Sequence, residues 1–222
     1  VVYDLAVELQ KLGHTVAVAC PEFSKIPTGI EHINTGEPAK TSEQSAYDKY
    51  RERLEALEFD IVHDHSWQKW AYLSKKKNDK IRIISTLHGM NCYGSPPPVK
   101  KPNFTCLSKS HAMEISGALG VNTRWCYNGL NLDFYQFQNS KSSRYLWLAR
   151  INKGKAPHVF IDVMKRTNQE ADLVGDDVLV EDRDYVRRIM EQVTMTNGLI
   201  RYWGAVPRER AGEAPKGPAS AC

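Results

Sequence analysis

Short apolar runs alternate with amphipathic segments along the first 130 residues of the chain. The runs are typical of buried strands, and apolar residues at every third or fourth position between them are typical of helices. Strands are predicted at residues 15–19, 31–34, 60–63, 81–87, 104–107 and 123–127, and helices at 1–12, 42–57, 68–77 and 108–119. Because strands alternate with helices, we expect one parallel sheet in this part of the chain.

The alternation stops over residues 131–143, which are polar and weakly periodic and are therefore predicted to be a linker. It restarts at Tyr145. A buried strand is predicted at 145–149, further strands at 171–174 and 199–203, and helices around 159–164 and over 180–193. Small and helix-breaking residues dominate 207–222, which is predicted to be an unstructured or foreign tail. The sequence thus predicts an α/β protein with one domain over 1–130 and a second over 144–206, which is incomplete because three strands are too few for an independent domain.

Composition excludes several classes of function. Thirty Lys and Arg residues against twenty-six Asp and Glu give a net charge of +4, which is too mild to indicate a nucleic-acid partner. No apolar run approaches the ~20 residues that cross a bilayer. The five cysteines are widely spaced and odd in number, which favours free thiols in a reducing cytoplasm. The basic cluster at residues 75–80 is interpreted as a solvated helix end, with contact to anionic lipid headgroups as the alternative.

Three cations lie between the predicted strand at 145–149 and the helix that follows it, namely Arg150, Lys153 and Lys155. A strand that delivers cations into the loop before a helix amino terminus forms an anion site, because the helix dipole and free N–H groups add to the side-chain charges. This arrangement is suited to a diphosphate. The alternative is that the three side chains are solvated loop charges.

Two other strands are predicted to end in histidine. His63 and His65 lie at the end of the strand at 60–63, and His88 follows the strand at 81–87. In open α/β sheets the carboxyl ends of the strands form the edge that binds ligands. A neutral imidazole there is a hydrogen-bond donor, and its titration near neutral pH would make activity pH-sensitive. The alternative for His88 is a hydrogen bond to a neighbouring loop. His63 and His65 lie only two positions apart at this strand end, but no metal site is predicted from this pair alone.

Six short segments occur in a defined order along the chain: DIVHDHS, TLHG, CLSKSHAMEI, YNGLNLDFY, LARINKGKAPH and LVGDD. LARINKGKAPH resembles the GR…EKG phosphate loop of the GT-B glycosyltransferases, in particular the large retaining family 4. The other five resemble motifs of the same family in the same order. Each is short and unspecific by itself, but their order over residues 1–204 makes the resemblance strong. The resemblance implies two Rossmann-like, doubly wound domains facing a cleft, with a nucleotide-sugar donor held mainly by the second and the acceptor mainly by the first.

The resemblance implies roles for single residues. Arg150 and Lys155 match the Arg and Lys that grip the donor diphosphate, and His88 matches the catalytic histidine beside the transferred sugar. The turn Asn128-Gly129 matches the one that leads to the hinge between the domains. Further candidate contacts with substrate or nucleotide are His65, Asn128, Gly129, Lys153, Gly175 and Asp176. Asp176 is expected either to line the nucleotide pocket or to cap the following helix.

The sequence departs from the family pattern at several positions. Ala149 and Ala156 stand where the family usually has Gly, and Gly154 stands where it has Glu. The family's Gly-rich loop would precede Val1, and its E-x7-E motif would follow residue 222. We therefore expect a GT-B protein truncated at both ends, with a first domain that lacks its first strand and an incomplete second, nucleotide-sugar-binding domain.

The expected function is transfer of a hexose from a nucleotide diphosphate sugar to a hydroxyl acceptor (a sugar, a lipid-linked sugar or a small molecule) with retention of configuration. No cofactor is expected besides this donor as co-substrate. No metal is expected either, because protein cations hold the diphosphate and no D-x-D motif precedes a sugar site. The expected location is the cytoplasm, with the inner face of the membrane as a second option. The alternatives are an inactive nucleotide- or acceptor-binding fragment and another GT-B activity such as a sugar-nucleotide epimerase.

Overall fold

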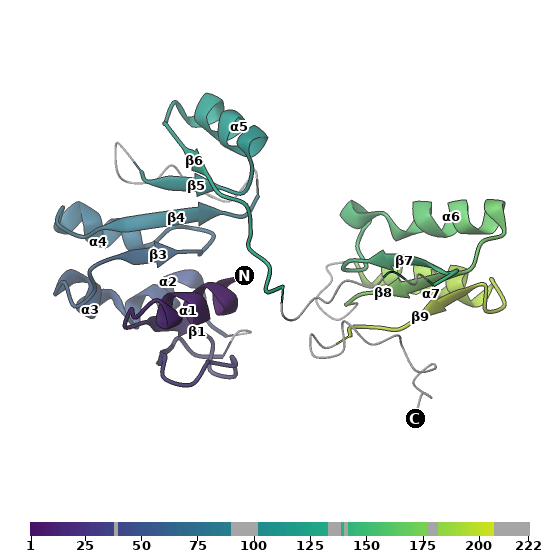
Figure 1. The fold of residues 1–222 in the computed structure, drawn as a ribbon, viewed down its shortest axis with the longest axis horizontal. Coiled ribbons are helices and arrows are strands. Elements are labelled where there is room, and N and C mark those ends of the chain that lie inside the picture. The colour runs from purple at the N-terminus through teal and green to yellow at the C-terminus, as the bar shows by residue number, and fades with distance from the viewer. Residues whose placement is uncertain (38–39, 90–101, 133–138, 140–141, 177–181, 207–222) are drawn as a thin grey trace. The chain divides into compact units, whose positions relative to one another are not determined.

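The computed structural model describes residues 1–37, 40–89, 102–132, 139, 142–176 and 182–206 (Figure 1). The chain divides into two compact units, Val1–Asn131 and Leu132–Cys222. Each unit has its own hydrophobic core and is built from helices and parallel strands, which confirms the α/β fold class. Most of the predicted linker at 131–143 and all of the predicted tail at 207–222 lie outside the described residues.

The first unit contains the predicted elements with one exception. Its helices are α1 (Val2–Lys11), α2 (Glu43–Asp48), α3 (Arg51–Glu55), α4 (Ala71–Lys77) and α5 (Lys109–Leu119), and its strands are β1 (Ala17–Cys20), β2 (Glu31–Asn34), β3 (Val62–Asp64), β4 (Ile83–Leu87), β5 (Phe104–Cys106) and β6 (Arg124–Trp125). The single helix predicted over 42–57 is wrong, because a turn at Lys49 and Tyr50 separates α2 from α3. Tyr50 leaves the helical conformation with φ −122° and ψ −3°.

The described strands of the first unit form two parallel sheets. β1 pairs with β2, and β3, β4, β5 and β6 form a second sheet in that order. Among the described residues β1 pairs only with β2 and β3 only with β4, so the expectation of one sheet is wrong for this part of the chain. The register of β3 with β4 sets Asp64 opposite Ser85, which brings the carboxyl ends of these two strands near each other.

The core of the first unit holds these strand ends in place. Leu87, at the end of β4, is fully buried together with Phe104, Cys106 and Ile115. α5 begins where Ser108 Oγ accepts a hydrogen bond from the backbone N–H of the third residue after it, at 3.1 Å. Ser108 therefore caps the amino end of α5.

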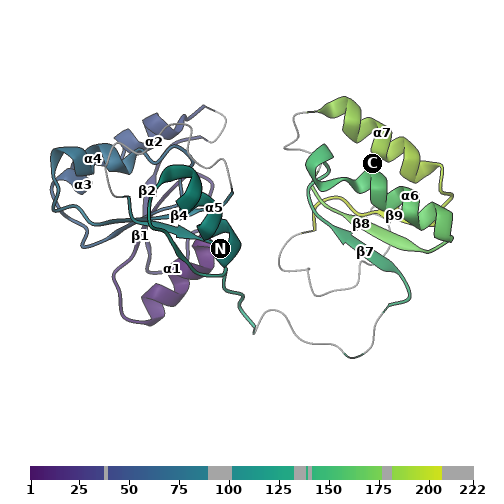
Figure 2. The ribbon, with the colours of Figure 1, turned by 90° about the horizontal axis from the view of Figure 1, so that it is seen from above.

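The second unit consists of β7 (Tyr145–Leu148), a short 3-10 turn (Lys153–Lys155), α6 (Pro157–Thr167), β8 (Ala171–Val174), α7 (Arg183–Thr194) and β9 (Ile200–Tyr202). The sheet is parallel and has the order β7-β8-β9, and both helices pack on one of its faces (Figure 2). Trp147 faces this core, whereas Leu146 and Leu148 are 63% and 69% exposed. The prediction that β7 is buried is wrong, because β7 is an edge strand and the described helices cover one face only.

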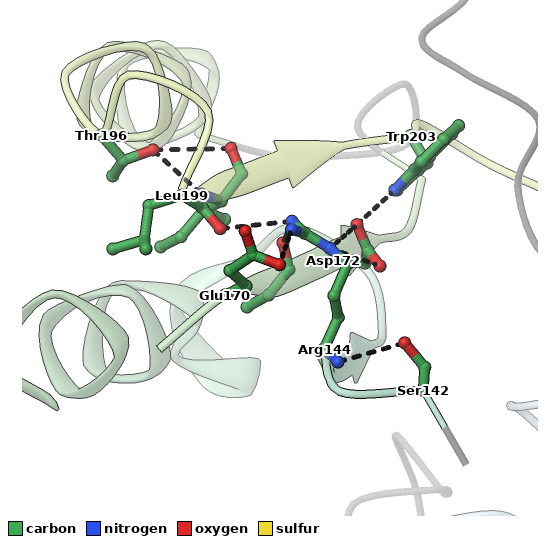
Figure 3. Close-up of polar contacts among 9 residues, drawn as sticks. Ser142, Arg144, Glu170, Asp172, Thr196, Leu199 and Trp203 are labelled. Carbon is green, nitrogen blue, oxygen red and sulfur yellow. Dashed lines mark hydrogen bonds and ion pairs between the residues drawn. The ribbon is translucent and has the colours of Figure 1, made fainter. Parts of the chain in front are cut away.

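Arg144, just before β7, joins the strands of the second unit at their amino ends (Figure 3). Its Nε donates to the carboxylate of Asp172 at 3.1 Å, and Nη1 lies 2.9 Å from the carboxylate of Glu170. Nη2 donates to the backbone oxygen of Leu199 at 3.2 Å, and Trp203 Nε1 donates to Asp172 at 2.9 Å. The Arg144 side chain is only 10% exposed. This arginine therefore has a structural role. Its removal would leave the carboxylate of Asp172 partly buried without its ion-pair partner, which destabilises the folded state.

Candidate functional site

The segment between β7 and α6 has the predicted strand–loop–helix form, and we call residues 149–156 the cation loop. Arg150 follows β7, and the fully buried Ile151 anchors the loop to the core. Asn152 Oδ1 accepts a hydrogen bond from the backbone N–H of Lys155 at 2.9 Å, which closes the 3-10 turn. Ala156 adopts a left-handed conformation with φ 52° before α6 begins. Left-handed backbone favours Gly over residues with a Cβ atom, so Ala156 holds a strained position at the end of this loop.

The three cations of this loop differ in their partners. Lys153 Nζ lies 2.7 Å from the carboxylate of Asp182, which also caps α7 by accepting from the backbone N–H of Tyr185. Arg150 and Lys155 are exposed and form no ion pair with a described residue. The first turn of α6 has no acidic residue and no capping side chain. Among the described residues, no acidic side chain pairs with Arg150, Lys155 or the amino end of α6, whereas Lys153 is paired with Asp182.

The carbonyl group of Ala149 approaches Gly175 closely. A Cβ atom at position 175 would lie 1.6 Å from Ala149 O, which no side chain tolerates. The backbone N–H of Ile151 donates to the carbonyl oxygen of Asp176 at 3.0 Å, which keeps the two backbone segments close together. Gly175 and Asp176 therefore support the cation loop through their backbone. The expectation that Asp176 caps the following helix is wrong, because Asp182 caps α7.

Three histidines of the first unit, His63, His65 and His88, lie together at the carboxyl ends of β3 and β4. His65 Nδ1 and His88 Nε2 are 2.9 Å apart, and His63 Nε2 lies 2.8 Å from Thr86 Oγ1. β3 ends at Asp64, so His65 lies beyond the strand and its ring centroid is 4.3 Å from that of His63. The sequence placed His65 and His88 only at the ends of two strands, and the structure brings them into contact.

Sequence reasoning missed Lys69, which lies beside these histidines. Its side chain is 2% exposed, and its backbone has φ 58°. Nζ donates to the carbonyl oxygen of Thr86 at 3.2 Å and to that of Ser66. The helix predicted over 68–77 includes Lys69, but α4 begins only at Ala71. Backbone carbonyl groups stabilise this ammonium group, and a single sequence carries no signal for such a contact.

A family model described as Glycosyltransferase Family 4 matches residues 1–134, which is more than half of the chain. The chain belongs to Glycosyltransferase Family 4. The matched part of this family 4 chain contains the histidine cluster, and the cation loop lies beyond it.

Two solved structures resemble the family 4 chain over most of its length. A glycosyltransferase from Rickettsia africae ESF-5 gives a TM-score of 0.64 at 17% identity, over 94% of this chain and 65% of that protein. AviGT4, a glycosyltransferase involved in avilamycin A biosynthesis, gives a TM-score of 0.58 at 17% identity, over 90% of this chain and 53% of that protein. These similarities show the GT-B fold with Rossmann-like parallel sheets. The chain spans less than two thirds of either structure. No curated protein matches the chain significantly.

Burial lowers the pKa of all three clustered histidines in the family 4 chain. For His65, burial and the nearby His63, His88 and Lys69 lower the pKa to about 3. Burial is also the main cause for His63 and His88, and Lys69 further lowers the pKa of His88. The imidazoles are therefore neutral at pH 7, and the expected titration of His88 moves below the usual range of histidine.

We expect the first unit of the family 4 chain to lose stability as the pH falls from about 7 towards 3. The pKa of His65 is about 3 in the folded state and near the ordinary 6.5 in the unfolded chain, so the unfolded state binds more protons between these values. The measurement is the thermal midpoint of the first unit at pH 7, 6 and 5. The His65→Asn variant should show a shallower decline, and an identical decline in both proteins would contradict the assignment.

The remaining candidate residues, Asn128 and Gly129, follow β6 and are exposed. The residues that the structure describes contain no group of three or more His, Cys, Asp or Glu side chains placed to hold a metal ion. None of the described helices is long and apolar enough to cross a membrane.

Proposed function

We propose that the protein transfers a hexose from a nucleotide diphosphate sugar to a hydroxyl acceptor with retention of configuration. The observation that carries this proposal is the cation loop, which presents Arg150 and Lys155 beside the amino end of α6 with no ion pair to a described residue. Membership of Glycosyltransferase Family 4 supports sugar transfer as the reaction class. Under this proposal the diphosphate of the donor binds the cation loop.

The chemistry of the reaction explains why fixed cations are needed. As the bond between sugar and diphosphate breaks, negative charge grows on the leaving nucleotide diphosphate and the sugar becomes oxocarbenium-like. Cations at the phosphates therefore stabilise the transition state more than the ground state. The guanidinium of Arg150 donates two parallel hydrogen bonds to one phosphate, and the ammonium of Lys155 acts as a point charge on the other. Lys153 would contact the phosphate only if its ion pair with Asp182 broke first.

Under this proposal the first unit binds the acceptor. His88 would lie beside the transferred sugar and donate a hydrogen bond to a hydroxyl or phosphate oxygen, with His65 as its neighbour. The acceptor would be a sugar, a lipid-linked sugar or a small molecule that carries the attacking hydroxyl group. In the second unit, Gly175 and Asp176 would line the nucleotide side of the cation loop.

Product analysis tests the proposal. The protein is incubated with UDP-, GDP- and ADP-sugars and a panel of hydroxyl acceptors, and nucleoside diphosphate release is measured. We expect release that depends on the acceptor, and NMR of the product should show the anomeric configuration of the donor. An inverted product would contradict retention. Release equal to that of an Arg150→Ala, Lys155→Ala double variant would contradict the role of the cation loop.

A second candidate is a binding function without transfer. The observation that favours it is the composition of the cation loop, whose cations and adjoining helix all belong to the second unit, so that binding of an anion there needs no residue of the first unit. This candidate predicts saturable binding of a nucleoside diphosphate or of an acceptor, and no acceptor-dependent release in the same assay.

Chelation of divalent metal is expected to leave transfer largely intact. Arg150 and Lys155 supply the positive charge that a Mg²⁺ ion provides at other diphosphate sites. The measurement is the initial rate of transfer in EDTA and in added Mg²⁺ or Mn²⁺. Rates within about twofold of each other are expected, and a strict requirement for added metal would count against metal-independent transfer.

A further inference from the structure

The hydrogen bond between His65 and His88 joins two elements that are separate in the sequence. His65 follows β3, and His88 follows β4 directly. Nδ1 of His65 and Nε2 of His88 are 2.9 Å apart, and the ring centroids are 5.2 Å apart. A bond between two neutral imidazoles needs one N–H group and one unprotonated nitrogen, so the position of the proton is a property of the pair.

The surroundings of His65 decide which ring donates. Its other nitrogen, Nε2, is buried and has no hydrogen-bond partner among the described residues. If His88 donated, His65 would have to carry its proton on Nε2, which would leave a buried N–H group without an acceptor. If His65 donates from Nδ1, the buried Nε2 is an unprotonated acceptor. Buried orphan N–H groups are rarer in proteins than under-satisfied acceptors, so the second arrangement is favoured.

We propose that His65 is a positioning residue that donates from Nδ1 to His88 Nε2 and so holds His88 in the Nδ1–H tautomer. His88 is exposed, and its Nδ1 has no hydrogen-bond partner among the described residues. The pair therefore presents one fixed N–H donor to a ligand oxygen, such as a hydroxyl or phosphate oxygen. The tautomer is independent of the proposed function, and its use in sugar transfer rests on that function.

The other groups around the pair are compatible with this arrangement. His63 is engaged with Thr86, and Nζ of Lys69 donates to backbone carbonyl oxygens. Partial removal from water and the nearby ammonium of Lys69 lower the pKa of these imidazoles and keep them neutral at pH 7, which is the condition for a single tautomer.

Nitrogen NMR of the histidine rings tests the proposal on the 222-residue chain at pH 7.5. A protonated ring nitrogen resonates well upfield of an unprotonated one, so each tautomer is read directly. His32 is an internal control, because its Nε2 lies 3.1 Å from the carbonyl oxygen of Cys20 and can only donate there. We expect the Nδ1–H form for His88 and the Nε2–H form for His32. A scalar coupling between His65 Nδ1 and His88 Nε2 should report the hydrogen bond itself.

Two variants separate positioning from general support of the fold. His65→Asp places an acceptor where Nδ1 stood and should switch His88 to the Nε2–H form or to imidazolium. His63→Asn removes the other neighbouring imidazole and should leave His88 unchanged. Amide spectra establish that each variant is folded. An Nε2–H tautomer of His88 in the wild-type chain, absence of the coupling, or an unchanged tautomer in folded His65→Asp would each overturn the proposal. None of these outcomes bears on diphosphate binding by the cation loop.

Discussion

Replacing Arg150 or Lys155 by Ala in an active protein that contains this chain is expected to lower kcat/KM roughly 30- to 1,000-fold, or about 2–4 kcal/mol. The loss arises in the transition state, where the leaving diphosphate carries its largest charge. Both side chains are exposed and form no ion pair with a described residue, so their removal should change the thermal midpoint little.

Lys165→Ala is the matched control for this prediction. Lys165 is an exposed cation in the last turn of α6, the same helix whose amino end faces the cation loop. Its replacement changes the net charge by the same amount, and kcat/KM should stay near the wild-type value. If all three variants lost activity equally, or if Arg150→Ala and Lys155→Ala kept near wild-type kcat/KM, the cations of this loop would not hold the donor.

Gly175→Ala is expected to destabilise the second unit by roughly 3 kcal/mol or more. The added Cβ would lie 1.6 Å from the backbone oxygen of Ala149, and a backbone atom cannot move aside as a flexible side chain can. The strand β7 and the cation loop would have to shift together. Amide hydrogen exchange of residues 171–174 in β8 measures the effect, because these amides report the opening of this sheet.

Gly154→Ala is the control for this substitution. Gly154 lies in the same loop, and a Cβ there would have Asn152 Oδ1 at 3.6 Å as its nearest neighbour, which is an ordinary contact. Its exchange rates should match the wild-type rates. Wild-type protection in Gly175→Ala would show that the close approach of Ala149 and Gly175 does not exist in solution.

The strand–loop–helix of the second unit was predictable because each part has a local signal. An apolar run precedes the cations, and the apolar residues after them repeat at helical spacing. The exposure of one face of β7 was not predictable. Leu146 and Trp147 are both large and apolar, and the sequence does not say which face of the strand the helices cover. The partner of Lys153 was equally hidden, since Asp182 lies 29 positions away in the chain.

The histidine cluster shows the same division between local and long-range information. The positions of His65 and His88 at strand ends followed from local hydrophobic pattern. Their hydrogen bond depends on the register of β3 with β4, which a single sequence does not reveal. Lys69 was missed because its burial depends on carbonyl groups from a different strand. The required absence of a side chain at Gly175 likewise comes from a contact across two strands.

The most direct test of the central claim is a titration of the 222-residue chain with UDP, GDP and ADP in the presence of EDTA, followed by amide NMR. The account predicts that at least one nucleoside diphosphate binds saturably and shifts the amide signals of the cation loop and of the first turn of α6. Lys165→Ala should bind like the wild type, and the Arg150→Ala, Lys155→Ala double variant should bind at least about 30-fold more weakly. No binding by the folded chain, or equal binding by the double variant, would contradict the claim that these two cations hold the donor diphosphate.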